Sequence, residues 1–122
     1  MTATADQQAW LYHFTRVPPI VQSEELLSYH GAEIVYVMGK FHLASFDPTP
    51  EDKALTDAMS NYWVNFAATG DPNGPGLPEW PAYHSKSGAY MRFGDTVGSD
   101  IHLLEKESDF FEHFNAVERA RD

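Results

Sequence analysis

The 122-residue sequence contains no cysteine, which excludes disulfides, thiol nucleophiles and cysteine-based zinc sites together. Basic residues are also few: 8 Lys plus Arg stand against 18 Asp plus Glu, and the formal net charge is −10. Such a surface repels phosphate backbones, so we expect no nucleic-acid partner. No apolar run approaches the roughly 18 residues of a membrane span, and no basic segment precedes an apolar one. We therefore see neither a transmembrane helix nor a signal peptide, and expect no membrane partner; the compartment stays undetermined.

The nucleophile motif of one large hydrolase class is missing as well. Gly-x-Ser-x-Gly presents a serine hydroxyl at a sharp strand-to-helix turn, because small residues flank the serine on both sides. None of the serines in this sequence has such neighbours, and no glycine-rich oxyanion-hole segment is found. The serines inspected are Ser23, Ser28, Ser45, Ser60, Ser85, Ser87, Ser99 and Ser108.

The residues that are present suffice for the core of one small domain, with 43% hydrophobic and 14% aromatic residues. Residues 1–8 are small and polar and predict a disordered lead. Residues 9–15 predict a strand, with Trp10, Tyr12 and Phe14 on one face and both faces largely buried. A short helix is expected just after His30-Gly31. Residues 89–93 predict a second, short strand.

Two longer helices follow from sequence pattern. Thr49-Pro50-Glu51-Asp52 is a strong helix start, with a capping hydroxyl, proline at the first position and acids in the first turn. Apolar residues then recur at helical spacing until Gly70 closes the helix. A further helix is expected over about residues 103–119, with an acidic, solvated face. The apolar positions of the first helix are Leu55, Ala58, Met59, Tyr62, Trp63, Phe66 and Ala67, all expected in the core.

Three segments resemble the type-B carboxylesterases, the α/β-hydrolases that include para-nitrobenzyl esterases and cholinesterases. Residues 29–39, YHGAEIVYVMG, resemble the family segment that holds the catalytic histidine. Residues 62–75, YWVNFAATGDPNGP, followed by Trp80-Pro81, resemble its C-terminal helix and turn. Residues 11–19, LYHFTRVPP, resemble its last core strand. The three stand in the family's order and at ordinary spacing.

The resemblance implies an α/β fold. Residues 9–122 would be the C-terminal portion of an α/β-hydrolase, comprising one core strand, a catalytic-histidine loop, amphipathic helices and short strands. This portion would be incomplete on its own. The triad of such enzymes follows the chain order serine, acid, histidine. A piece that holds only the histidine would therefore take its serine, its acid and its oxyanion hole from residues outside this chain.

His30 is the candidate catalytic residue that the resemblance implies. It would be the general base of a Ser-His-Glu/Asp triad that hydrolyses carboxylic esters through an acyl-enzyme. Glu33 lies three residues further on and would face a similar side of a helix, where it could tune the polarity of the active-site floor. A carboxylate in a first helical turn is an equally good interpretation. The sequence departs from the common family pattern at Ser28 and Tyr29, which is expected to alter the pocket entrance.

The other histidines have weaker claims. His13 is expected to lie within the first strand, and His42, His84, His102 and His113 show no metal-ligand spacing, so no metal site is predicted. No cofactor is implied.

The leading interpretation is thus the C-terminal part of a serine esterase, inactive alone. It would self-associate or associate with the remainder of the hydrolase. A non-catalytic binding or assembly module of the same fold stays open as the alternative, because one fold can host both.

Overall fold

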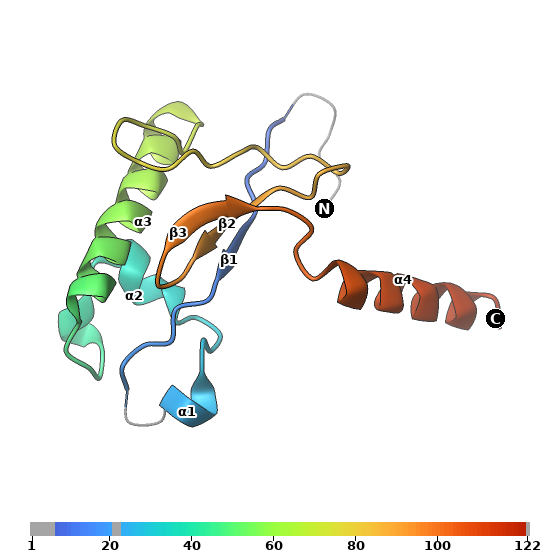
Figure 1. Ribbon diagram of the computed structural model, residues 1–122, viewed down its shortest axis with the longest axis horizontal. Helices are drawn as coiled ribbons and strands as arrows, with labels where there is room; N and C mark the ends of the chain where they lie inside the picture. The colour runs from blue at the N-terminus through green and yellow to red at the C-terminus, as the bar shows by residue number, and fades with distance from the viewer. Residues whose placement is uncertain (1–6, 21–22, 122) are drawn as a thin grey trace.

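The computed structural model describes residues 7–20 and 23–121. Its elements, in chain order, are β1 (Tyr12–Phe14), α1 (Ser23–Leu26), α2 (Glu33–Met38), the 3-10 helix η1 (Phe41–Leu43), α3 (Pro50–Thr69), β2 (Tyr90–Phe93), β3 (Val97–Asp100) and α4 (Glu105–Arg119) (Figure 1). The predicted lead over residues 1–8 falls mostly on residues 1–6, which lie outside the described residues. Of the described helices, none is both long and apolar enough to cross a membrane.

The strands form one mixed sheet in the order β1-β2-β3. β1 runs parallel to β2, with Tyr12 opposite Met91 and Phe14 opposite Phe93. β2 and β3 form an antiparallel pair. β1 is therefore an edge strand among the described residues. Its three residues are only half-buried, so the prediction of a strand buried on both faces was wrong.

Helix α3 begins and ends where the sequence predicted. The Thr49 side chain accepts a hydrogen bond from the Asp52 backbone N–H, while the Asp52 carboxylate accepts one from the Thr49 backbone N–H. These reciprocal bonds form a capping box, which satisfies two backbone donors that the first turn would leave open. Gly70 ends the helix with φ 80°, a left-handed conformation that glycine adopts without a steric penalty.

The core lies between α2 and α3 on one side and the sheet on the other (Figure 1). Trp80 is its centre: its ring lies 5.3 Å from that of Phe93 and 5.5 Å from that of Tyr62, edge to face in both cases. Its indole N–H donates to the Leu11 carbonyl at 3.0 Å, which fixes Trp80 to the residue before β1. The fully or nearly buried members of this core are Tyr36, Leu55, Met59, Tyr62, Trp80, Met91 and Phe93.

Two parts of the helical prediction need correction. Phe66 was expected in the core, yet it is 50% exposed and meets only the edge of the Trp10 ring, at 5.7 Å. The reason is that the apolar stripe of α3 continues past the region that the sheet covers. The helix predicted near the C-terminus exists as α4, but none of its side chains is buried, and it extends away from the sheet (Figure 1). β3 and α1 were not predicted at all.

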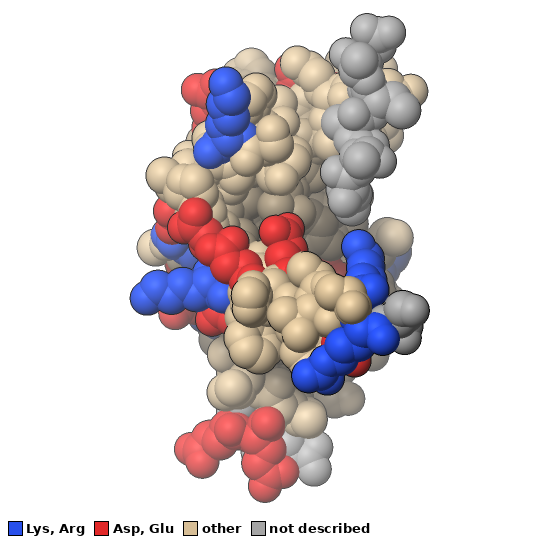
Figure 2. Space-filling model, turned by 90° about the vertical axis from the view of Figure 1, so that its right-hand side faces the viewer, with Lys and Arg blue, Asp and Glu red and all other residues tan. Residues whose placement is uncertain are grey.

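Apolar residues of α4 share the surface with charged ones. Figure 2, viewed from the side toward which α4 extends, shows uncharged surface bordered by acidic and basic side chains. Phe110 stacks on Phe114 with 6.4 Å between ring centroids, although both rings are more than half exposed. The predicted solvated acidic face is confirmed, because Glu105, Glu107, Asp109 and Glu112 are all exposed.

Candidate functional site

His30 lies in a tight turn that leads into α2. The Ala32 backbone N–H donates to the Tyr29 carbonyl at 3.1 Å, and the Ile34 N–H donates to the Gly31 carbonyl at 3.2 Å. Gly31 has φ 83°, in the left-handed region that other residues adopt only with strain. Ala32 is buried and points inward, whereas His30 is exposed. The turn thus presents the imidazole at the surface of the chain while its own backbone is fixed.

A side-chain hydrogen bond ties this turn to the sheet. The Ser28 hydroxyl donates to the backbone carbonyl of Phe14, the last residue of β1, at 3.0 Å. His30 therefore follows directly on a residue held at the carboxyl end of β1. In open α/β sheets, ligands bind beyond the carboxyl ends of the parallel strands. Ser28 was seen in the sequence as a departure from the family pattern; its part in holding the turn was not foreseen.

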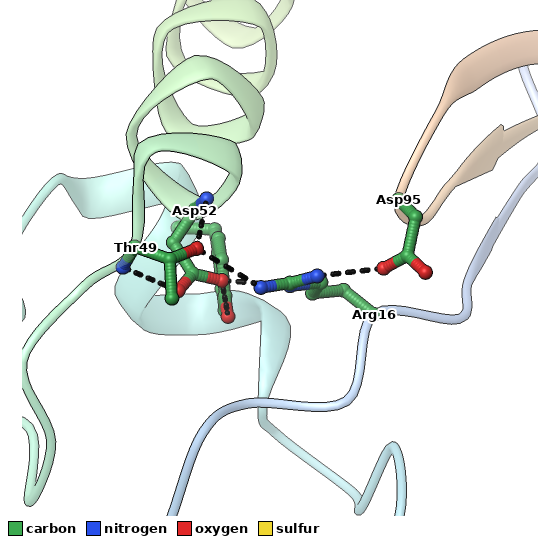
Figure 3. A network of polar contacts seen from close by, with 5 residues as sticks. Arg16, Thr49, Asp52 and Asp95 are labelled. Carbon is green, nitrogen blue, oxygen red and sulfur yellow. Dashed lines mark hydrogen bonds and ion pairs between the residues drawn. The ribbon is translucent and has the colours of Figure 1, made fainter.

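A buried carboxylate lies at the base of the same region (Figure 3). Asp52 is inaccessible to solvent, and its Oδ1 accepts hydrogen bonds from Arg16 Nε at 2.7 Å and from the Tyr36 hydroxyl at 2.8 Å. Its Oδ2 accepts the Thr49 backbone N–H at 2.8 Å. Buried charges persist in proteins only when they are paired and hydrogen-bonded, and both oxygens of this carboxylate meet that requirement. We refer to Arg16, Tyr36, Thr49 and Asp52 as the Asp52 hub.

Arg16 extends the hub to a third segment. Its Nη1 donates to Asp95 Oδ1 at 2.6 Å, in the turn between β2 and β3, and its Nη2 donates to the Thr49 hydroxyl at 3.2 Å (Figure 3). The guanidinium, with a side chain 13% exposed, thus links the end of β1 to the start of α3 and to the β2–β3 turn. Its fork of N–H donors makes several such bonds at once, which a lysine could not do.

The electrostatics of the hub favour the ionised carboxylate. Burial by itself would raise the pKa of Asp52, but the bonds from Arg16, the Thr49 backbone and Tyr36 outweigh it and hold the pKa below its usual value. The pKa of Tyr36 is raised, first by burial and then by the neighbouring Asp52. The bond to Asp52 is the chief reason why the pKa of Arg16 is raised. The hub is therefore a fixed arrangement of one anion, one cation and one neutral hydroxyl at neutral pH.

Glu33, the second predicted site residue, is the first residue of α2 and is half-buried. His30 precedes the helix rather than lying on it, and within the described structure no ion pair joins the two side chains. The pKa of Tyr12 is raised by burial and, secondarily, by the charge of Glu33, so this carboxylate lies within electrostatic reach of the sheet. Its place in the first helical turn also fits the simpler interpretation of a carboxylate at a helix N-terminus.

The remaining histidines do not gather into a site. His13 lies in β1 with its ring 6.4 Å from that of Tyr90, as a strand residue should. His84 and His102 make local contacts, with the Lys86 backbone N–H at 3.2 Å and with Glu105 at 3.6 Å. Over residues 7–20 and 23–121, no three His, Asp or Glu side chains are grouped so that they could hold a metal ion.

Two concave surfaces border the core. The first, of about 350 Å³, is lined mainly by aromatic rings at the junction of β1, the C-terminal half of α3 and Trp80. The second, of about 390 Å³, lies beside the His30 turn and includes Tyr29 and Val35. The aromatic pocket is bounded by Trp10, Tyr12, Tyr62, Trp63, Phe66 and Trp80.

Comparisons with known proteins give one answer. The model of the carboxylesterase family matches residues 1–111. Rabbit (Oryctolagus cuniculus) liver carboxylesterase 1 is 35% identical over 120 residues, which is 96% of this chain and 21% of that protein. Carboxylesterase 5A of the cat (Felis catus) is 41% identical over 87 residues, covering 67% of this chain and 16% of that protein.

Solved structures agree with the sequence relatives. A carboxylesterase of Geobacillus stearothermophilus is 30% identical with a TM-score of 0.70, over 84% of this chain and 21% of that one. A PNB esterase, 23% identical with a TM-score of 0.72 and the same coverage, supports the fold alone. The expected fold class, an incomplete portion of an α/β-hydrolase, is confirmed. The chain spans about a fifth of the length of these relatives.

Proposed function

The chain belongs to the carboxylesterase family, and we propose that it supplies the general-base histidine, His30, of a serine carboxylester hydrolase. A neutral imidazole can take the proton of a serine hydroxyl during attack on the ester and return it to the leaving alcohol. The substrate class is carboxylic esters, which follows from the family.

One observation supports this role above the others. The Ser28–Phe14 hydrogen bond holds the turn at the carboxyl end of β1, and the same turn leaves His30 exposed. A base that must meet a serine contributed by other residues has to be placed in this way, fixed in its backbone and open at its ring. The serine, the triad acid and the oxyanion hole would come from residues other than these 122.

The face that would receive them has open bonding capacity. β1 pairs with β2 along one edge only, and the aromatic pocket beside it includes the half-exposed Phe66. An open strand edge next to apolar surface tends to recruit another chain. We place the remainder of the hydrolase on this face; pairing with a second copy of the chain is the alternative.

A non-catalytic module is the second candidate function. The observation that favours it is the lack of any Gly-x-Ser-x-Gly segment among the eight serines. Such a module would keep the hub and the aromatic core for binding or assembly and would not need His30. Its signature would be tight association with a partner, and no labelling of the resulting complex by a serine-directed phosphonate.

The test uses His30→Ala in a complete hydrolase that has residues 1–122 as its last part. Such a protein can be made by replacing the matching fifth of rabbit liver carboxylesterase 1. We expect kcat to fall by several orders of magnitude, since triads of this type lose on the order of 10⁶-fold without their histidine. His42→Ala, another exposed histidine, is the matched control and should keep nearly full activity.

A second readout separates catalysis from folding. Because His30 is exposed, its removal should change the free energy of unfolding by no more than about 0.5 kcal/mol. Retention of more than about a tenth of wild-type kcat, equivalent to a barrier change of only ~1.4 kcal/mol, would refute the assignment.

A further inference from the structure

The segment between β1 and α3 has little regular structure of its own, although it contains His30. Its helices α1 and α2 have 4 and 6 residues. Isolated helices of that length are not stable in water, because too few hydrogen bonds offset the cost of nucleation. The position of the His30 turn must therefore come from contacts with the rest of the chain.

Those contacts converge on one oxygen atom. Arg16, which follows β1 and precedes His30, donates to Asp52 Oδ1 at 2.7 Å. Tyr36, which lies in α2 and follows His30, donates to the same oxygen at 2.8 Å. The chain that enters the His30 segment and the chain that leaves it are thus bound to a single point (Figure 3).

That point is itself well fixed. Asp52 belongs to the first turn of α3, where it completes the capping box with Thr49, and it is fully buried. Tyr36 is fully buried too, with its ring 5.2 Å from that of Phe14 and 5.3 Å from that of Phe41. Packing therefore leaves neither side chain room to choose another partner.

We propose that Asp52 and Tyr36 are positioning residues for His30, which rests on the proposed role of His30 as the general base. The carboxylate holds α2 through the Tyr36 hydroxyl, and α2 in turn holds the turn that precedes it. Neither residue touches the reacting atoms. A displacement of about 1 Å in a catalytic group can cost roughly a hundredfold in rate, so the loss of one such anchor should be visible in kcat.

The closest matched control is Tyr62→Phe. Tyr62 is, like Tyr36, a fully buried tyrosine whose hydroxyl donates one hydrogen bond, in its case to the Pro78 carbonyl. That bond lies at the far end of α3, away from the His30 segment. Tyr36→Phe and Tyr62→Phe therefore remove the same group from two similar environments, and only the first breaks the hub.

The first measurement is amide hydrogen exchange on the 122-residue chain. We expect wild-type protection over residues 29–38, faster exchange there in Tyr36→Phe and Asp52→Asn, and no local change there in Tyr62→Phe. Lack of protection of this segment in the wild type would overturn the proposal. So would equal effects of the two tyrosine variants, since the hub would then only stabilise the fold as a whole.

The second measurement is ester hydrolysis by the complete hydrolase described above. Tyr36→Phe should lower kcat about 10- to 100-fold and leave KM within a factor of about three, whereas Tyr62→Phe should change neither. An unchanged kcat in Tyr36→Phe would refute the positioning role, even where Asp52→Asn is too unstable to assay. If His30→Ala kept full activity, the proposed function would fail instead, and the exchange data would still report on the hub independently.

Discussion

Removal of the Arg16 guanidinium should destabilise the chain far more than removal of a surface arginine. Arg16→Met leaves the buried Asp52 carboxylate without its cationic partner, and breaking a buried ion pair in this way costs about 3–5 kcal/mol. Arg92→Met is the matched control. Its pair with Asp100 spans 3.2 Å between side chains that are 39% and 47% exposed, and exposed pairs contribute about 0–1 kcal/mol.

The assay is urea unfolding followed by tryptophan fluorescence, because Trp63 and Trp80 lie in the aromatic core beside β1. A slope of about 1–3 kcal/mol per molar urea would turn the Arg16→Met effect into a midpoint shift of one molar or more. Equal midpoints for Arg16→Met and Arg92→Met would refute the view that the hub is held by charge pairing in a buried site.

The pH dependence provides an internal check. Because the pKa of Asp52 is lower in the folded chain than its unfolded value of about 3.9, its contribution is present above about pH 4 and is lost as pH falls through the folded value. Without Arg16, burial would raise that pKa. The difference in stability between wild type and Arg16→Met should therefore be largest near pH 7 and should shrink toward pH 3. A difference that grows in acid would contradict the assigned charge states.

Three further predictions follow. The chain alone should hydrolyse activated esters no faster than free imidazole does, because it lacks a nucleophile elbow; burst kinetics and phosphonate labelling would contradict this. In sedimentation equilibrium at micromolar concentration the chain should be a dimer or larger unless the remainder of the hydrolase is added, whereas a compact monomer that binds no hydrophobic dye would count against the open face. Trp80→Ala should destabilise by about 3–5 kcal/mol in urea titrations, since this buried ring is surrounded by Tyr62, Trp63 and Phe93, while Trp10→Ala, at the half-exposed margin, should cost clearly less.

The local elements could be predicted from the sequence because their signals are local. The capping hydroxyl of Thr49, the proline after it and Gly70 determine the ends of α3 through bonds within a few residues. The turn at Gly31 and the short α2 follow from the family pattern in the same way. β3 escaped prediction because Val97–Asp100 holds a glycine and two polar residues and is a strand only through its pairing with β2.

The hub could not be predicted, for a physical reason. Arg16, Tyr36 and Asp52 are far apart in the sequence, and each has an ordinary local explanation as a residue after a strand, a helix residue and a first-turn acid. Only the tertiary fold brings their polar atoms within 2.7–2.8 Å. Phe66 shows the converse: helical spacing predicts which side of α3 is apolar, but the extent of the sheet beneath it decides how much of that side is covered.

The contrast between His30 and its anchors separates the two candidate functions. Gly31, Ala32 and the hub are required by the backbone and by packing, so a binding module and a catalytic segment would both keep them. His30 is exposed, and burial in the described structure does not require an imidazole there. The identity of this residue is therefore explained by chemistry rather than by folding. A substitution at His30 should then abolish ester hydrolysis and leave the stability of the chain unchanged, a combination that a purely structural scaffold does not predict.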